Sequence, residues 1–195
     1  MVTHQRRDKS YSIFRCNKRF IHREGVKMNF KIEVEDFAWI DGSLDNEDDL
    51  CLHGHAIAYI GAKKLEYDAT VSATALYLLK TLTEHIINED NQMLPCCGFS
   101  MIPDEKLENV TIIGCPNGID WSVIHEGDSI KLILEDGTET IISVCEYEKE
   151  VFRFADKVES FYMSCSPKKM PEDEYDRNGY IAFWNEWHRR RANKK

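Results

Sequence analysis

Alternating apolar and polar residues predict most of the strands in this chain. Residues 30–34 alternate between apolar and charged side chains, which is the pattern of a strand with one buried face. The apolar run at residues 50–60, a turn at Gly61 and the segment 65–67 together predict a β-hairpin. A shorter apolar run at residues 110–113 predicts one more strand within a loop-rich region.

The most regular alternation lies in residues 121–147 and predicts a three-stranded meander. Turn residues separate its segments at 127–128 and at Asp136-Gly137. An Asp-Gly pair is typical of a two-residue hairpin turn, because both central positions of that turn require positive φ. We therefore expect the second and third strands of the meander to be joined at this pair.

Apolar residues at three- and four-residue spacing predict three helices. The first spans about five turns from residue 70 to residue 86, and the second spans residues 148–164. The third begins at Asp176 and carries an aromatic stripe that consists of Tyr180, Phe183, Trp184 and Trp187. Strands and helices come in blocks rather than in strict alternation, so the sequence predicts an α+β fold in which about three helices pack on antiparallel β-sheet.

Length and composition are those of one globular domain. The chain has 195 residues, of which 43% are hydrophobic and 30% are charged. No segment approaches the roughly 20 consecutive apolar residues of a membrane-spanning helix, and no apolar run with a cleavage site follows the N-terminus. Seven cysteines in no regular framework favour reduced thiols. We therefore expect a cytoplasmic protein without a membrane partner.

The first 27 residues differ from the rest of the chain, because they are basic and lack periodicity. They carry eight Lys and Arg against two acids. Arg23-Glu24-Gly25 can be encoded by a purine-rich run shortly before the Met28 codon, where a bacterial ribosome-binding site would lie. Two interpretations stay open: the native protein starts at Met28, or residues 1–27 are a disordered basic arm. In both, residues 28–195 form a single α+β domain.

Charge is the strongest compositional indication of function. Residues 28–187 carry 32 acids against 12 Lys and Arg. An acidic body attracts a basic protein partner and opposes a nucleic-acid backbone, although the segment 184–195 mixes aromatic and basic residues. Six surface acids in two polar loops are the predicted partner-binding residues: Glu47, Asp48, Asp49, Glu172, Asp173 and Glu174.

A cysteine and histidine set is the alternative candidate site. Its members are Cys51, His53, His55, Cys96, Cys97 and Cys115. The first three alternate along a predicted strand and so share one face, and the other three lie in loops. Thiolate and imidazole are the usual zinc ligands, but the chain has no Cys-x-x-Cys clip. The same set could supply a Cys–His nucleophile pair, or it could be a polar strand face with a buried thiol. Apart from this zinc alternative, the sequence predicts no cofactor.

Other enzyme signatures are either absent from the sequence or have their residues at unsuitable positions. Asp120, Ser122 and His125 have the residue types of a hydrolytic triad, but Asp120 and Ser122 alternate on a predicted strand and His125 falls on its other face. No Gly-x-Ser-x-Gly elbow, Walker sequence or dinucleotide-binding fingerprint occurs. The sequence therefore predicts no catalytic residue.

Five segments carry a resemblance to known proteins. They read DWSV at 120–123, GD at 127–128, LEDG at 134–137, VFRFADKV at 151–158 and FY at 161–162. This strand–strand–helix pattern resembles small bacterial α+β proteins of the toxin-immunity type, and it equally resembles uncharacterised families of similar size. The resemblance implies a partner-binding role and transfers no catalytic residue.

Together these features favour one hypothesis over two others. The favoured protein is a non-catalytic acidic binding protein of the bacterial cytosol, an immunity protein that neutralises a basic toxin. The alternative is a Cys/His-based metalloprotein or small hydrolase of unknown substrate. A third interpretation is a homodimer formed through the aromatic last helix.

Overall fold

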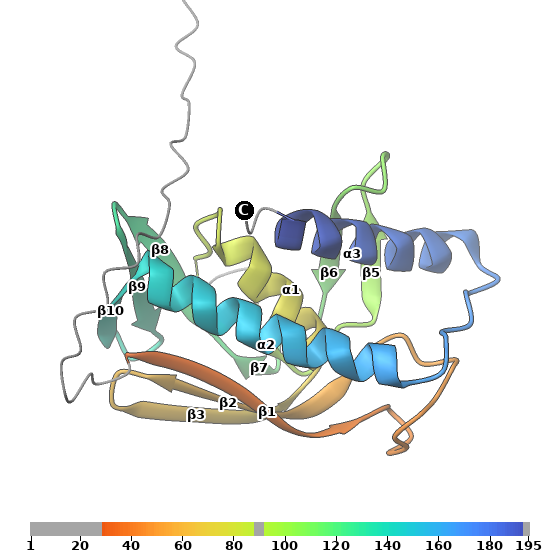
Figure 1. Cartoon of the computed structure of the whole chain (residues 1–195), viewed down its shortest axis with the longest axis horizontal. Coiled ribbons are helices and arrows are strands. Elements are labelled where there is room, and N and C mark those ends of the chain that lie inside the picture. Colours follow the sequence, from red (N-terminus) through yellow and green to blue (C-terminus); the bar gives the residue numbers. More distant parts are fainter. Residues whose placement is uncertain (1–28, 88–91, 193–195) are drawn as a thin grey trace, which may run out of the picture.

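A computed structural model describes residues 29–87 and 92–192 and confirms the α+β fold class (Figure 1). The strands are β1 (Phe30–Ala38), β2 (His53–Ile60), β3 (Lys63–Ala69), β4 (Leu94–Pro95), β5 (Ser100–Pro103), β6 (Val110–Ile113), β7 (Gly118–Ile119), β8 (Trp121–Glu126), β9 (Ser129–Leu134) and β10 (Glu139–Ser143). The helices are α1 (Val71–Thr81), α2 (Val144–Ser164) and α3 (Glu174–Ala192). The two interpretations of residues 1–27 lie outside the described residues.

One antiparallel sheet, ordered β1-β2-β3, forms the base of the molecule, and α2 lies across it (Figure 1). The predicted alternation places Phe30, Ile32 and Val34 on the buried face. Two cationic side chains of α2 bind the free edge of β1. Arg153 donates to the Ile32 carbonyl at 2.6 Å, and Lys157 donates to the Val34 carbonyl. These bonds satisfy backbone groups that an edge strand leaves unpaired.

The predicted meander is confirmed as the sheet β8-β9-β10, but its second turn differs from the expected one. Only Gly137 has positive φ, at +79°, whereas Asp136 does not. Leu134 N donates to the Thr138 carbonyl at 3.0 Å, and Gly137 N donates to the Leu134 carbonyl at 2.9 Å. The connection is therefore a three-residue loop that ends in a left-handed glycine, a common hairpin alternative.

Three helix limits also differ from the sequence prediction, and the smallest difference is at α3, which begins at Glu174 rather than at Asp176. α1 ends at Thr81, because Ile86 pairs with Val123 of β8 through bonds of 3.0 and 2.7 Å instead of continuing the helix. α2 begins at residue 144 rather than 148. Ser143 accepts from Glu146 N and donates to the Glu146 carboxylate at 2.6 Å. This capping box starts the helix inside the segment that the alternation had assigned to a strand.

The aromatic stripe of α3 packs into the core, where Phe183 and Trp187 are fully buried. Gly179 lets this helix approach β5, because a Cβ atom at that position would lie 2.1 Å from the Met101 carbonyl oxygen. The close contact fixes the start of α3 against β5. It also determines the shape of the surface beside Met101.

Candidate functional site

A surface pocket of about 330 Å³ lies where α3 begins, at one end of the molecule. Three segments that are far apart in the sequence form it: the β1–β2 loop, the residues around the start of β5, and the α2–α3 loop with the first turn of α3. Its lining residues are Asp48, Leu50, Phe99, Met101, Lys169, Met170, Pro171, Glu172 and Asp176.

The pocket has an apolar floor with one prominent aromatic side chain. Leu50 and Met101 are buried, whereas Phe99 is 68% exposed and Met170 is 41% exposed. Exposed large apolar side chains that gather in a concave surface are typical of a binding site. The arrangement can therefore bury an apolar group or the aliphatic stem of a long side chain.

Acidic side chains line the pocket beside its apolar floor. Asp48 comes from the β1–β2 loop, Glu172 and Asp176 come from the α2–α3 loop and the first turn of α3, and all three line the pocket. One cation of the protein also lies there, because Lys169 forms an ion pair of 3.3 Å with Asp48. The lining therefore holds three carboxylates and one ammonium, which favours a ligand that is cationic and partly apolar.

Other acidic side chains of the β1–β2 loop accept hydrogen bonds from groups of the same loop. Asp49 accepts from Ile40 N at 2.7 Å and from Cys51 N at 2.9 Å. Asp41 accepts from the backbone and hydroxyl of Ser43 at 2.9 and 2.6 Å. These bonds lower the pKa of the Asp41 carboxyl. The acidic run is thus mainly a set of Asx-type turns, and it presents Asp48 at the pocket.

Contacts from the α2–α3 loop and from α2 hold the acidic β1–β2 loop in place. Lys168 donates to the Asn46 carbonyl at 2.6 Å, and its ammonium lies 2.9 Å from the ring centroid of Trp39. The buried Tyr162 hydroxyl donates to the Leu50 carbonyl at 2.8 Å and accepts from Leu52 N at 3.1 Å. The two walls of the pocket are therefore held together by direct bonds.

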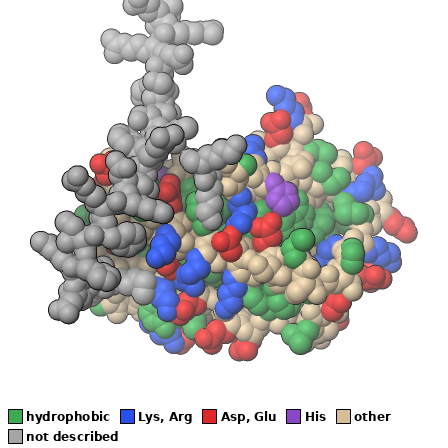
Figure 2. Space-filling view, in the orientation of Figure 1, with side chains coloured by type: hydrophobic (Ala, Val, Ile, Leu, Met, Phe, Trp, Pro, Cys, Tyr) green, Lys and Arg blue, Asp and Glu red, His purple; other side chains and the backbone are tan. Residues whose placement is uncertain are grey.

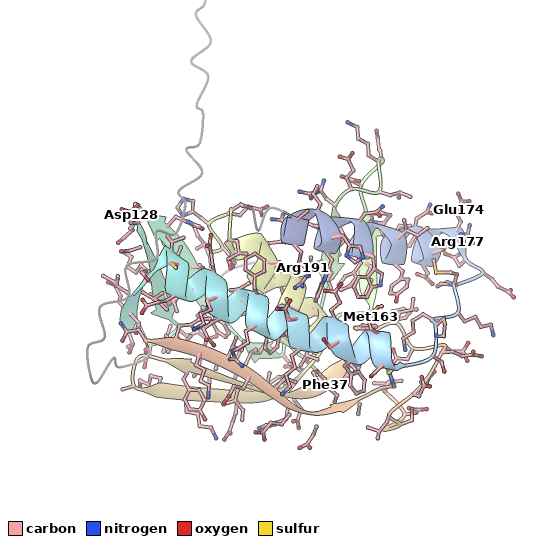
Figure 3. The ribbon with its side chains drawn as sticks, in the orientation of Figure 1. Phe37, Asp128, Met163, Glu174, Arg177 and Arg191 are labelled. Carbon is pink, nitrogen blue, oxygen red and sulfur yellow. The ribbon has the colours of Figure 1, made fainter. Side chains whose placement is uncertain are left out.

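The six predicted partner-binding acids do not form one site, because they have different positions and contacts in the structure. Asp48 and Glu172 line the pocket, and Asp49 serves the loop backbone. Asp173 caps α3, because it accepts from the backbone N–H of Tyr175 at 2.9 Å and of Asp176 at 3.1 Å. Glu47 contributes its backbone carbonyl, which accepts from Lys169 N. Glu174 lies in the first turn of α3 (Figure 3).

Four further lining residues, Phe99, Met101, Met170 and Asp176, were not among the predicted partner-binding residues. Asp176 belongs to the same acidic run as Glu172, so charge patterning could have included it. The three apolar residues carry no such sequence signal. Phe99 and Met170 are exposed and Met101 is buried, and only the packed structure brings the three together.

The structure brings together three members of the predicted cysteine and histidine set and separates them from the histidines. The Cys96, Cys97 and Cys115 sulfur atoms all lie within 4.8 Å of one another. Cys96 lies beside Tyr67 of β3 and raises the pKa of the Tyr67 hydroxyl. Tyr67 pairs with Ala56, and His55 is the next residue along β2, so His55 points to the opposite face of the sheet.

The remaining members of that set have local partners. Nδ1 of His55 lies 2.7 Å from the Asp68 carboxylate, which raises the pKa of this imidazole. Burial lowers the pKa of His53. Cys51 is buried and donates to the Gly98 carbonyl at 3.4 Å, and burial raises the pKa of its thiol to about 12. A thiol with so high a pKa is a poor nucleophile.

Free thiols were expected throughout the chain, and the described cysteines meet this expectation with one exception. Five of them are free: Cys51, Cys96, Cys97, Cys115 and Cys165. Cys145 is disulfide-bonded, so the expectation is wrong at that position. The three clustered thiols are among the free ones.

Asp120 and His125 have structural contacts rather than triad geometry. The buried Asp120 carboxylate accepts from Trp121 N at 2.8 Å and from Met93 N at 3.2 Å. Burial raises the pKa of Asp120 to about 6. His125 Nε2 lies 2.7 Å from the Thr81 carbonyl oxygen. These contacts fix backbone segments around the meander.

The basic end of α3 is engaged with acids of the same chain. The guanidinium of Arg190 is buried and bonds to Glu186 at 2.8 Å. Arg191 lies 2.9 Å from Glu159. These contacts pair two of the three arginines at this end of the helix with acids of the same chain.

Ion pairs also interrupt the acidic surface. The described residues carry thirty acids against fifteen Lys and Arg. Figure 2 shows basic and acidic side chains interleaved over the visible face, with hydrophobic side chains between them. The excess of acid is therefore real, but on this face it does not form one continuous negative surface. The pocket is a local concentration of carboxylates beside apolar side chains.

No helix in the described part of the chain combines the length and the apolar character that crossing a membrane requires. No protein-family model, curated protein or solved structure matches the chain.

Proposed function

We propose that this protein is a non-catalytic binding protein that takes a cationic, partly apolar segment of another protein into the pocket lined by Asp48, Glu172 and Asp176. An immunity protein of the bacterial cytosol, which neutralises a basic toxin, is the specific form of this proposal. The observation that carries it is the convergence of three carboxylates, from two loops distant in the sequence, on an apolar floor with an exposed phenylalanine.

The chemistry of the pocket suits a lysine or arginine side chain of the partner. The aliphatic stem would lie against Phe99 and Met170, and the charged head would meet the carboxylates of Asp48 and Glu172. An aromatic side chain surrounded by polar groups is a frequent energetic centre of protein interfaces. Arginine would gain more than lysine, because its planar head can bond two carboxylate oxygens at once.

Long-range attraction contributes less than the net charge alone implies. Many carboxylates already pair with cations of the same chain, as Glu66 does with Lys64 at 2.5 Å. Partner selection therefore rests on the local pocket, and the remaining acid excess mainly raises the association rate. A test must therefore separate the effect of the pocket carboxylates from the effect of net charge.

The test is fluorescence anisotropy with a labelled peptide in which arginine alternates with leucine and tryptophan. Binding is compared between the wild type, a pocket variant and a surface variant. The pocket variant carries Asp48→Asn, Glu172→Gln and Asp176→Asn. The surface variant carries Asp128→Asn, Glu135→Gln and Glu139→Gln, three exposed acids of the meander, and it changes net charge by the same amount.

We expect the pocket variant to bind at least about tenfold more weakly, and the surface variant to bind within about twofold of the wild type. Affinity should fall as salt rises. An equal loss in both variants would show charge attraction without a site and would contradict the proposal. The immunity role is tested by co-expression with the products of adjacent genes, where a basic toxin should co-purify with the wild type and not with the pocket variant.

A further inference from the structure

Three thiols from two loops meet at the surface beside β3. Cys96 and Cys97 follow β4, and Cys115 precedes β7. The sulfur atoms of Cys97 and Cys115 are 3.2 Å apart, and all three sulfur atoms lie within 4.8 Å of one another. Cys97 is exposed, and Cys96 and Cys115 are partly exposed, so an ion from solution can reach them.

Backbone bonds hold the two loops in this arrangement. Pro95 pairs with Gly118 in the two-stranded sheet β4-β7, and Cys96 N donates to the Asn117 carbonyl at 3.1 Å. The Thr70 hydroxyl, at the start of α1, donates to the Cys96 carbonyl at 3.1 Å. The thiols are thus gathered by the fold before any ligand binds, which reduces the entropy that a ligand must overcome.

Two glycines allow the loops to pack this closely. A Cβ atom at Gly114 would lie 2.8 Å from the Cys97 carbonyl oxygen. A Cβ atom at Gly98 would lie 2.7 Å from the Thr70 methyl group and 2.9 Å from Ala73. Larger residues at either position would push the cysteine loops away from each other or away from α1.

The spacing of the sulfur atoms matches a soft metal ion. A tetrahedral zinc ion with Zn–S bonds of about 2.3 Å holds its sulfur ligands about 3.8 Å apart. The sulfur atoms of Cys97 and Cys115 are 3.2 Å apart and all three lie within 4.8 Å of one another, so a zinc ion could reach all three after small side-chain adjustments. Thiolates also select zinc over magnesium and calcium, which prefer oxygen.

We propose that Cys96, Cys97 and Cys115 form a three-thiolate zinc site whose fourth ligand is water. Tyr67 of β3 lies beside Cys96. The histidines take no part, because His55 is on the opposite face of the sheet. The three cysteines are not among the residues that line the pocket of Asp48, Glu172 and Asp176.

Binding exchanges protons for one metal ion. Three S–H groups lose their protons, one Zn²⁺ takes their place, and the site carries one net negative charge. Three protons are therefore released for each ion bound when the thiols start protonated. Affinity should then rise with pH until the thiols are ionised in the metal-free protein.

The test uses the full chain, reduced and then freed of metal. Zn²⁺ is titrated in competition with a chromophoric chelator, and Co²⁺ is titrated separately because sulfur-to-cobalt charge-transfer absorption reports thiolate ligands. The test variants are Cys96→Ser, Cys97→Ser and Cys115→Ser. The controls are Cys165→Ser, a free cysteine at the end of α2, and His55→Ala. Circular dichroism checks that each variant is folded.

We expect one Zn²⁺ per chain, with affinity lower by at least about tenfold in each test variant and unchanged in both controls. The charge-transfer band should weaken in the test variants alone. Absence of stoichiometric binding by the reduced protein would overturn the proposal. A loss of affinity in His55→Ala, or binding that is unchanged in all three serine variants, would overturn it as well, because the ligands would then lie elsewhere.

Discussion

Lys169 Nζ lies 3.3 Å from a carboxylate oxygen of Asp48, within the lining of the proposed partner site. Both side chains are largely exposed, at 64% and 70%. The protein thus places one of its own cations where the proposal places a cation of the partner. An exposed pair of this kind stabilises the fold by about 0–1 kcal/mol, so a partner can displace it at little cost.

Replacing Lys169 by alanine should therefore strengthen binding of the arginine-rich peptide. Loss of a competing pair worth up to about 1 kcal/mol corresponds to an affinity up to about fivefold higher. Lys63→Ala is the matched control, because Lys63 forms a similar exposed pair of 2.9 Å with Asp136. Anisotropy titrations of both variants measure the effect. Weaker peptide binding by Lys169→Ala would mean that Lys169 supports the pocket rather than competing for it.

Gly179→Ala should destabilise the protein, although alanine is the better helix former. The new Cβ atom would meet the Met101 carbonyl at 2.1 Å, so α3 must move away from β5. We expect a loss of about 1–3 kcal/mol in the free energy of unfolding, measured by urea denaturation. Asn178→Ala, the preceding position of the same helix, should show no comparable loss. A stable Gly179→Ala variant would contradict the close contact.

Tyr162→Phe removes the hydroxyl that joins α2 to the β1–β2 loop. The Leu50 carbonyl then loses its donor, whereas Leu52 N still has the Ser72 hydroxyl at 3.2 Å. We expect the free energy of unfolding to fall by about 1–2 kcal/mol. Hydrogen exchange at the Leu52 amide should become faster. Tyr59→Phe, on the open face of the first sheet, is the control and should leave both quantities unchanged.

Asp120 should make stability depend on pH in a defined window. Burial raises its pKa from the ordinary 3.8 to about 6, so the unfolded chain loses this proton at lower pH than the folded chain. The contribution of Asp120 to stability therefore falls as pH rises from about 4 to about 6, and then stays constant.

Asp120→Asn removes this pH-dependent contribution and keeps an oxygen that can accept from Trp121 N and Met93 N. Relative to the wild type, the variant should gain stability between pH 4 and pH 7, by at most about 3 kcal/mol. Urea denaturation at several pH values measures the difference between the two proteins, in which other titrating groups cancel. A difference that does not change with pH would contradict an elevated pKa.

Local patterns predicted most elements, because strand and helix periodicity are set by neighbouring residues. The alternation at residues 30–34 and the meander both proved to be strands. The errors at the end of α1 and at the start of α2 had different causes. The capping box of Ser143 and Glu146 was readable in the sequence, whereas the bridge from Ile86 to Val123 joins two distant segments.

The candidate sites were predictable only in part, since both depend on which loops come together. The acids at 48 and 172 were chosen for charge, yet only the packing of the α2–α3 loop on the β1–β2 loop brings them to one pocket. Phe99 could not be recognised, because an apolar residue in a sequence is most simply assigned to the core.

The sequence alone determined the types and approximate limits of most elements, the acidity of the body and the three loop cysteines, because these depend on residue identity and short-range spacing. The short strands β4, β5 and β7 lie in the region that the sequence had assigned to loops. Only the tertiary structure brings the three thiols together and places the histidines of β2 on the other face of the sheet. It also brings the two acidic loops together at the pocket that Phe99 lines. Strand parity specifies two faces but not which loop covers each one. That choice depends on packing between residues distant in the chain.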